Sequence, residues 1–304
     1  MIKIMKKLLH SLACLFILVN SAKLSYALAL PENHSVNGGL TIIPIDINQK
    51  PEAYFEGKRI PVLPSPQPRQ WLLIVAIPLK NTNSVQYINV IKPIKASIPF
   101  HVSEKFYNTQ FLNIKDISKV DPQPEDLIRI EKETKKLTQI FANYSNANPF
   151  EKQFTAPLRG PVTSLFGLKR VYNKQPRDPH SGLDIAADQG KPVYAVNRGI
   201  VADTGDYFFT GNTVILDHGM GVFSVYAHLS KILVKTGEPV KQGQELGLVG
   251  MTGRVTGPHL HWTMVVNQTL VEPLLFVPFR KITVAPITPD KKSNKSTQDA
   301  TTKS

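Results

Sequence analysis

Three short segments in the second half of the chain hold side chains that could bind a metal and catalyse hydrolysis. They contain His180 and Asp184, then His228, then His259 and His261. A catalytic zinc ion takes three protein ligands, imidazole nitrogen or carboxylate oxygen, and leaves a position for water, whose pKa falls to ~7. His180, Asp184 and one histidine of the last pair make such a set. The other two histidines suit a general base and a donor to the developing oxyanion.

The spacing of these residues predicts strands rather than helices. Side chains two residues apart share a face on a strand but not on a helix. The apolar residues around His259 and His261 favour a strand, so the two imidazoles should project together. His180 and Asp184 are also an even number of residues apart, and Gly182 between them argues against a helix. The region has no cysteine, which argues against a structural zinc site, because such sites usually have thiolate ligands.

At these residues the sequence resembles the lysostaphin-type (LytM-like) zinc metallopeptidases of family M23. The likeness lies in the patterns His180-x-x-x-Asp184, Tyr-Ala-His228-Leu and His259-x-His261. It extends to the surrounding segments HSGLDIAA, GNTVILDHG and GPHLHW, and it covers about residues 156–278. The motif set is specific because several separate segments agree in order and spacing.

The resemblance implies a role for each residue and an activity. It implies that His180, Asp184 and His261 bind one zinc ion per chain. It implies that His259 is the general base and that His228 orients water or stabilises the transition state. The implied activity is a zinc-dependent endopeptidase that hydrolyses peptide cross-links of bacterial peptidoglycan, of the murein DD-endopeptidase type. D-alanyl–diaminopimelate cross-links are the first expectation, and glycine bridges stay open.

Two other interpretations compete with this one. The first is a non-catalytic wall-binding or hydrolase-activator protein with an M23-like fold and a vestigial site. The complete set of ligand and catalytic residues argues against it. The second is a zymogen-like enzyme whose N-terminal β domain covers the groove. Short β domains precede the peptidase in some family members, so this region should either position or limit access to the active site.

Residues 1–29 have the composition of a secretory signal peptide. Lysines precede an apolar run over residues 8–19, which is short for a membrane span, and cleavage is expected after Ala27 or Ala29. An uncleaved membrane anchor stays open, whereas lipidation at Cys14 is disfavoured because Ser-Leu-Ala-Cys is a poor lipidation motif. Cys14 is the only cysteine, so the cleaved chain can form no disulfide. We therefore expect an exported, periplasmic protein.

The chain is basic, with a formal net charge of +13 over 304 residues. Loss of a signal peptide with four lysines and no acids would leave about +9. Nucleic acid can be the partner of a basic protein, but no recognition motif is present and export removes the protein from cytoplasmic nucleic acid. We therefore expect a peptidoglycan peptide as substrate, association with anionic envelope surfaces, and no nucleic acid. The sequence specifies no oligomeric state.

The expected fold is mainly β. Residues 30–121 predict a small N-terminal β domain, with a strand at 71–79 buried on both faces and a proline-rich loop at 61–68. Residues 122–154 predict a connecting helix, over 122–144 with one packed apolar face, and a linker. Residues 155–281 predict an antiparallel peptidase domain, because strands and glycine turns follow one another without a βαβ rhythm. The polar residues 282–304 predict a disordered tail.

Several other polar residues of the sequence are given no catalytic role. His218 lies in an Asp-His-Gly segment and is expected in a turn, exposed to solvent. Tyr207 and Tyr226 could line the groove or simply pack. His34 and His101 stand alone and are expected to be structural.

Overall fold

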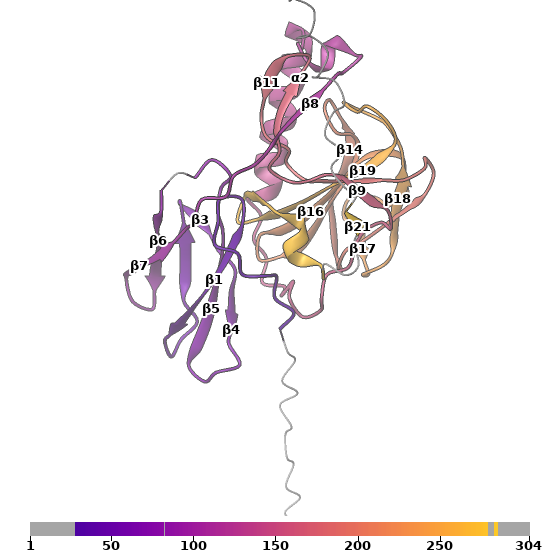
Figure 1. The fold of residues 1–304 in the computed structure, drawn as a ribbon. Coiled ribbons are helices and arrows are strands. Elements are labelled where there is room, and N and C mark those ends of the chain that lie inside the picture. Colours follow the sequence, from indigo (N-terminus) through magenta and orange to yellow (C-terminus); the bar gives the residue numbers. More distant parts are fainter. Residues whose placement is uncertain (1–27, 82, 279–282, 285–304) are drawn as a thin grey trace, which may run out of the picture.

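The computed structural model describes residues 28–81, 83–278 and 283–284. The predicted signal peptide and Cys14 therefore lie outside the described residues, as does most of the predicted tail. The structure confirms the mainly β fold class, with antiparallel sheets and one long helix (Figure 1). Within the described part of the chain, no helix combines the length and the apolar character that a bilayer crossing requires.

The N-terminal region consists of two small sheets, seen in indigo and purple in Figure 1. The first has the order β1-β5-β4 and the second the order β3-β2-β6-β7. Their strands are β1 (Leu40–Asp46), β2 (Glu52–Phe55), β3 (Lys58–Arg59), β4 (Val62–Pro64), β5 (Gln70–Ala76), β6 (Val85–Lys92) and β7 (Ala96–His101). The prediction of a loop at residues 61–68 is wrong for residues 62–64, which form strand β4. Strand β4 lies at the edge of its sheet, the position where a sheet tolerates proline.

Strand β5 joins the two halves of the molecule because both of its faces are buried. Leu73 and Val75 belong to the core of the N-terminal region. Ile74 and Ala76, which point the other way, belong to the core that the C-terminal half builds. The continuous apolar run at residues 71–79 therefore predicted this strand correctly, and the N-terminal sheets pack against the C-terminal half.

The C-terminal half is built on one large sheet with the order β17-β14-β15-β16-β19-β12-β9-β21, to which β13, β18 and β20 are attached. The central pairs are antiparallel. The strands are β9 (Pro161–Ser164), β12 (Leu183–Ala186), β13 (Pro192–Tyr194), β14 (Gly199–Tyr207), β15 (Gly211–Gly219), β16 (Val222–Ile232), β17 (Pro239–Val240), β18 (Glu245–Val249), β19 (His259–Val266), β20 (Thr269–Val271) and β21 (Thr283–Val284). Short 3-10 helices lie at Ile117–Lys119 and Pro273–Phe276. Strand β21 falls within the segment expected to be disordered and pairs in parallel with β9.

A fourth sheet connects the N-terminal segment to the C-terminal half. Its order is β11-β10-β8, with β8 (Thr109–Leu112), β10 (Lys169–Tyr172) and β11 (Gln175–Arg177). Strand β8 runs parallel to β10, and Gln110 is the register partner of Arg170. Residues assigned from the sequence to the N-terminal β domain thus contribute a strand beside β10, which precedes the first metal-ligand segment in the chain. The boundaries at residues 121 and 154 stay predictions.

Helix α2 (Pro124–Phe141) is the predicted connecting helix. Its C-terminal half packs Leu137, Ile140 and Phe141 against the large sheet. The first half does not follow the prediction of a continuous packed face, because Leu127 is 53% exposed. Ion pairs hold this half instead, including Arg129 to Asp206 at 3.2 Å.

Candidate active site

Strands β12 and β19 lie side by side and bring the first and third sequence segments together. In their antiparallel register, Asp184 is directly opposite His261. His259 and His261 both lie on β19, as predicted. His180 precedes β12, and the chain between them passes so close to β19 that a Cβ atom at Gly182 would lie 2.5 Å from the carbonyl oxygen of Trp262. Glycine therefore allows the approach of His180 to the pair.

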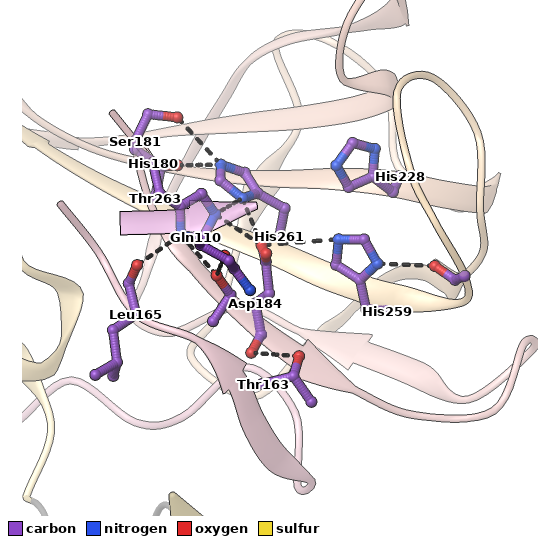
Figure 2. A network of polar contacts seen from close by, with 12 residues as sticks. Gln110, Thr163, Leu165, His180, Ser181, Asp184, His228, His259, His261 and Thr263 are labelled. Carbon is purple, nitrogen blue, oxygen red and sulfur yellow. Dashed lines mark hydrogen bonds and ion pairs between the residues drawn. The ribbon is translucent and has the colours of Figure 1, made fainter. Parts of the chain in front are cut away.

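Three ligand atoms converge in this place: His180 Nε2, Asp184 Oδ1 and His261 Nδ1 (Figure 2). The two nitrogens are 3.0 Å apart, and they lie 2.9 and 2.8 Å from the carboxylate oxygen. All three residues are buried. Two imidazole nitrogens and one carboxylate oxygen are donors that zinc prefers, and a tetrahedral zinc site separates its ligand atoms by roughly 3.3 Å. The three residues could therefore hold a metal ion with little movement.

Each of the three side chains is oriented by a second contact. His180 Nδ1 donates to the carbonyl oxygen of Leu165 at 2.7 Å, which leaves Nε2 for a metal. His261 Nε2 lies 3.0 Å from the hydroxyl of Thr263, which leaves Nδ1 available to bind a metal. Such contacts fix the tautomer and ring orientation of metal-binding histidines.

Arg170 orients the third side chain, and sequence reasoning did not identify it. Its guanidinium group is buried and donates from Nη2 to Asp184 Oδ2 at 3.1 Å and to Ser164 Oγ at 3.0 Å. From Nη1 it donates to Gln110 Oε1 at 2.6 Å, so a residue of β8 supports the site from outside the C-terminal sheet. The one available signal was strand alternation, which places Arg170 on the same face of β10 as the buried Tyr172.

The other two histidines lie beside the cluster, and the dashed line from His259 to Asp184 in Figure 2 marks a longer, 3.7 Å contact rather than a hydrogen bond. His228 Nδ1 donates to the carbonyl oxygen of Thr252 at 2.8 Å, and His259 Nδ1 donates to that of Gly257 at 2.8 Å. The two ring centres are 4.9 Å apart, and His259 Nε2 lies 3.7 Å from Asp184 Oδ1. Both Nε2 atoms are therefore available toward the metal position. The structure thus brings all five residues singled out from the sequence into one place.

Burial dominates the electrostatics of the site. It lowers the pKa of His180 to about 4 and that of His228 to about 3, so both are neutral at neutral pH. Burial alone would raise the pKa of Asp184, but its interactions with His180 and His261 hold it well below its usual range. A neutral imidazole and an ionised carboxylate are the protonation states that metal binding requires.

A cleft of about 590 Å³ opens over these residues. His180, Asp184, His228, His259 and His261 all line it. The N-terminal region also contributes to its wall, through Lys58, Pro78, Leu79 and Lys80.

The residues given no catalytic role lie elsewhere, but one prediction about them is wrong. His218 is buried on β15, not exposed in a turn, and bonds to the carbonyl oxygen of Arg198 and the hydroxyl of Ser224. Tyr207 and Tyr226 are buried and do not line the cleft. His34 and His101 do not line it either.

Comparison with known proteins identifies the family. The sequence model of the family described as Peptidase family M23 matches residues 178–273. The sequence model of the Peptidase family M23 N-terminal domain matches residues 33–105. A solved M23 peptidase structure from Pseudomonas aeruginosa is 36% identical, covers 81% of this chain and 96% of its own, and superimposes with a TM-score of 0.68. The chain belongs to peptidase family M23.

Curated relatives match somewhat more than a third of the chain. The peptidoglycan DD-endopeptidase ShyA of Vibrio cholerae is 45% identical over 107 residues, which are 35% of this chain and 25% of that protein. The DD-carboxypeptidase/endopeptidase Mpg of Neisseria meningitidis is 41% identical over 113 residues, 37% of this chain and 26% of that protein. The chain thus spans about a quarter of the length of these relatives.

Proposed function

We propose that this protein is a zinc-dependent endopeptidase that hydrolyses peptide cross-links of bacterial peptidoglycan, of the DD-endopeptidase type. The observation that carries the proposal is the convergence of His180, Asp184 and His261, with two further histidines beside them in an open cleft. The names of relatives such as ShyA support the substrate class. The assembled set of five residues disfavours a non-catalytic wall-binding or activator protein.

In the proposed site, one zinc ion is held by His180 Nε2, Asp184 Oδ1 and His261 Nδ1. When bound, zinc polarises the scissile carbonyl group and lowers the pKa of a water molecule. Asp184 supplies the one negative charge among these ligands, and Arg170 occupies its second oxygen so that Oδ1 stays directed at the metal. Contacts to Leu165 and Thr263 orient the two imidazole ligands, and burial keeps His180 neutral.

His259 is the proposed general base. Its Nδ1 donates to the carbonyl oxygen of Gly257, so Nε2 carries the lone pair and faces the metal position. In the reaction, Nε2 takes a proton from the attacking water and gives it to the leaving amine, so that one peptide bond is exchanged for a carboxylate and an amine.

His228 is proposed to position the attacking water. A donor to the oxyanion would need a proton on Nε2, but Nδ1 already carries the ring proton that binds Thr252. Burial lowers the pKa of His228 to about 3, which opposes a second proton. A neutral His228 can accept a hydrogen bond from water at Nε2. This favours water positioning over the alternative role of oxyanion donor.

Peptidoglycan lies outside the cytoplasmic membrane, so the proposal includes export to the periplasm. The test is hydrolysis of purified peptidoglycan by the zinc-loaded protein, followed by mass spectrometry of the released fragments. We expect cross-linked dimers to be converted into monomers, and we expect the His259→Ala variant to bind zinc without this conversion. Zinc-loaded wild-type protein that leaves the dimers intact would overturn the proposed function.

A further inference from the structure

Arg254 lines the cleft from the loop that connects β18 to β19. Its guanidinium carbon lies 4.3 Å from the ring centre of Phe209 and 4.7 Å from that of Tyr172. Its backbone N–H donates to the carbonyl oxygen of Phe209 at 2.8 Å, and Nη1 lies 3.4 Å from the carbonyl oxygen of Lys119. The two rings therefore hold the guanidinium group in place, while several of its five N–H donors are left for another partner.

The carboxylates around Arg254 already have basic partners. Three acidic residues line the cleft and the adjoining pocket: Asp184, paired with Arg170 at 3.1 Å, Asp178, paired with Lys80 at 3.2 Å, and Asp121, paired with Arg177 at 3.0 Å. Among the described residues, no carboxylate oxygen lies within 4.0 Å of the Arg254 guanidinium nitrogens. Arg254 thus carries a positive charge that the protein does not neutralise at close range.

Arg254 is also close in the chain to the proposed catalytic pair. The carbonyl oxygen of Thr252, two residues earlier, holds His228, and that of Gly257, three residues later, holds His259. One loop therefore carries the supports of both imidazoles and the unneutralised cation. Lys58, the other cation lining the cleft without a carboxylate partner, lies at the far end of β19, where it bonds to Gln268.

We propose that Arg254 binds a free carboxylate of the substrate, next to the peptide bond that is cut. The inference rests on the proposed function and narrows its substrate class. In a D-alanyl–diaminopimelate cross-link, the scissile nitrogen is attached to a carbon atom that bears a free carboxylate. A planar guanidinium group can hold such a carboxylate through two parallel hydrogen bonds. Glycine bridges have no carboxylate at this position.

The test compares two substrates that differ in one group. The first is a purified muropeptide dimer with a D-alanyl–diaminopimelate cross-link and a free carboxylate beside the scissile nitrogen. The second is the same dimer with that carboxylate converted to an amide. We expect the zinc-loaded wild-type protein to cleave the free carboxylate form with a kcat/KM about 10–100-fold higher, the range for a hydrogen bond to a charged group.

Variants assign this preference to the residue. Arg254→Met should remove the preference by lowering kcat/KM for the free carboxylate form and leaving the value for the amide form nearly unchanged. Arg254→Lys should keep part of the preference, because the charge remains but the second parallel hydrogen bond does not. The matched control is Arg159→Met, which removes an exposed cation outside the cleft and should retain the wild-type ratio. Calorimetry measures the affinity of the His259→Ala protein for each dimer without turnover. We expect tighter binding of the free carboxylate form.

Each outcome decides one of the two proposals. A wild-type protein that cleaves both dimers equally well overturns the role of Arg254 and leaves the proposed function intact. A preference that survives in Arg254→Met also overturns it. If Arg254→Met does not fold, the wild-type ratio and Arg254→Lys still decide. A zinc-loaded wild-type protein that cleaves neither dimer contradicts the proposed function itself.

Discussion

The five residues of the candidate site are held in two different ways. His180, Asp184 and His261 contact one another directly, and their ligand atoms form a triangle with sides of 2.8–3.0 Å. His228 and His259 make no hydrogen bond to that triangle or to each other among the described residues, and backbone carbonyl groups hold each of them. In the first group Asp184 and His261 are register partners on β12 and β19, whereas carbonyl groups of the loop between β18 and β19 hold both imidazoles of the second group.

This difference separates binding from chemistry. A metal site needs rigidly placed ligands, and the register of β12 and β19 places two of them, Asp184 and His261, opposite each other. In the proposed mechanism, His259 and His228 would both have to face a water molecule at the metal. The loop over residues 250–258 provides the backbone carbonyl groups that bind both imidazoles. The backbone of His228 has a positive φ of 65°, which a non-glycine residue adopts only when its surroundings impose it.

The largest effect should follow from removing a member of the metal triangle. His180→Ala and Asp184→Ala each leave two donors, and we expect both variants to lose the metal and all detectable hydrolysis. Metal content after dialysis, measured by plasma mass spectrometry, checks the expectation. Asp188→Ala, which removes an exposed carboxylate on the same segment, is the matched control and should keep about one zinc ion per chain. Full activity of metal-free protein would refute the metal assignment.

A second prediction contrasts the two histidines of β19, which differ by two residues and share a face. His259→Ala should keep zinc, while turnover falls by about 10²–10⁴-fold, as expected for the loss of a positioned base. His261→Ala should lose zinc. Metal content and hydrolysis measured on both variants separate the roles. If His259→Ala loses the metal and His261→Ala retains it, the two roles are exchanged.

The sequence predicted the parts of this site that depend on strand periodicity. Alternation placed His259 and His261 on one face, and Gly182 argued against a helix between His180 and Asp184. The apolar run at 71–79 predicted a strand buried on both faces because no polar face interrupts it. The sequence did not indicate that this strand joins the two halves, because an apolar run does not show which other residues will pack against it.

Contacts between distant residues could not be predicted in the same way. Arg170 and Gln110 are 60 residues apart, and Gln110 lies in a segment that the sequence assigned to another region. Their contact depends on the parallel pairing of β8 with β10. His218 was predicted to be exposed because Asp-His-Gly is typical of turns. The turn lies after it, at Met220 and Gly221, so β15 carries His218 into the core.

The support from Arg170 should matter less than the ligands but still measurably. Removal of a side chain that orients a ligand typically weakens metal affinity by about 10–100-fold. We expect Arg170→Met to fall in this range, because it frees Asp184 Oδ2 and leaves Ser164 without its cation. Gln110→Ala should have a smaller effect in the same direction. Competition with a chelator of known affinity measures the zinc affinity of both variants. Unchanged zinc affinity in Arg170→Met would show that the three ligands keep their positions without Arg170.

The smallest predicted effect concerns His218, a buried histidine bonded to a backbone carbonyl and a hydroxyl, outside both groups. Burial, partly offset by the hydrogen bond to Arg198, lowers its pKa to about 4, against about 6.5 in an unfolded chain. The unfolded chain therefore binds a proton more readily than the folded protein between these values. The contribution of His218 to the free energy of unfolding should therefore be fully present above pH 6.5 and be lost as the pH falls toward 4.

Between pH 7 and pH 5.5 this one residue should contribute a loss of about 1 kcal/mol in the free energy of unfolding. His218→Gln, which cannot titrate, should lack that part of the loss. The measurement is urea unfolding of the wild-type and variant proteins at both pH values, with the same zinc content. The readout is the difference between the two pH dependences, so a constant destabilisation by the substitution does not affect it. Parallel pH dependences in the two proteins would mean that His218 keeps an ordinary pKa in the folded chain.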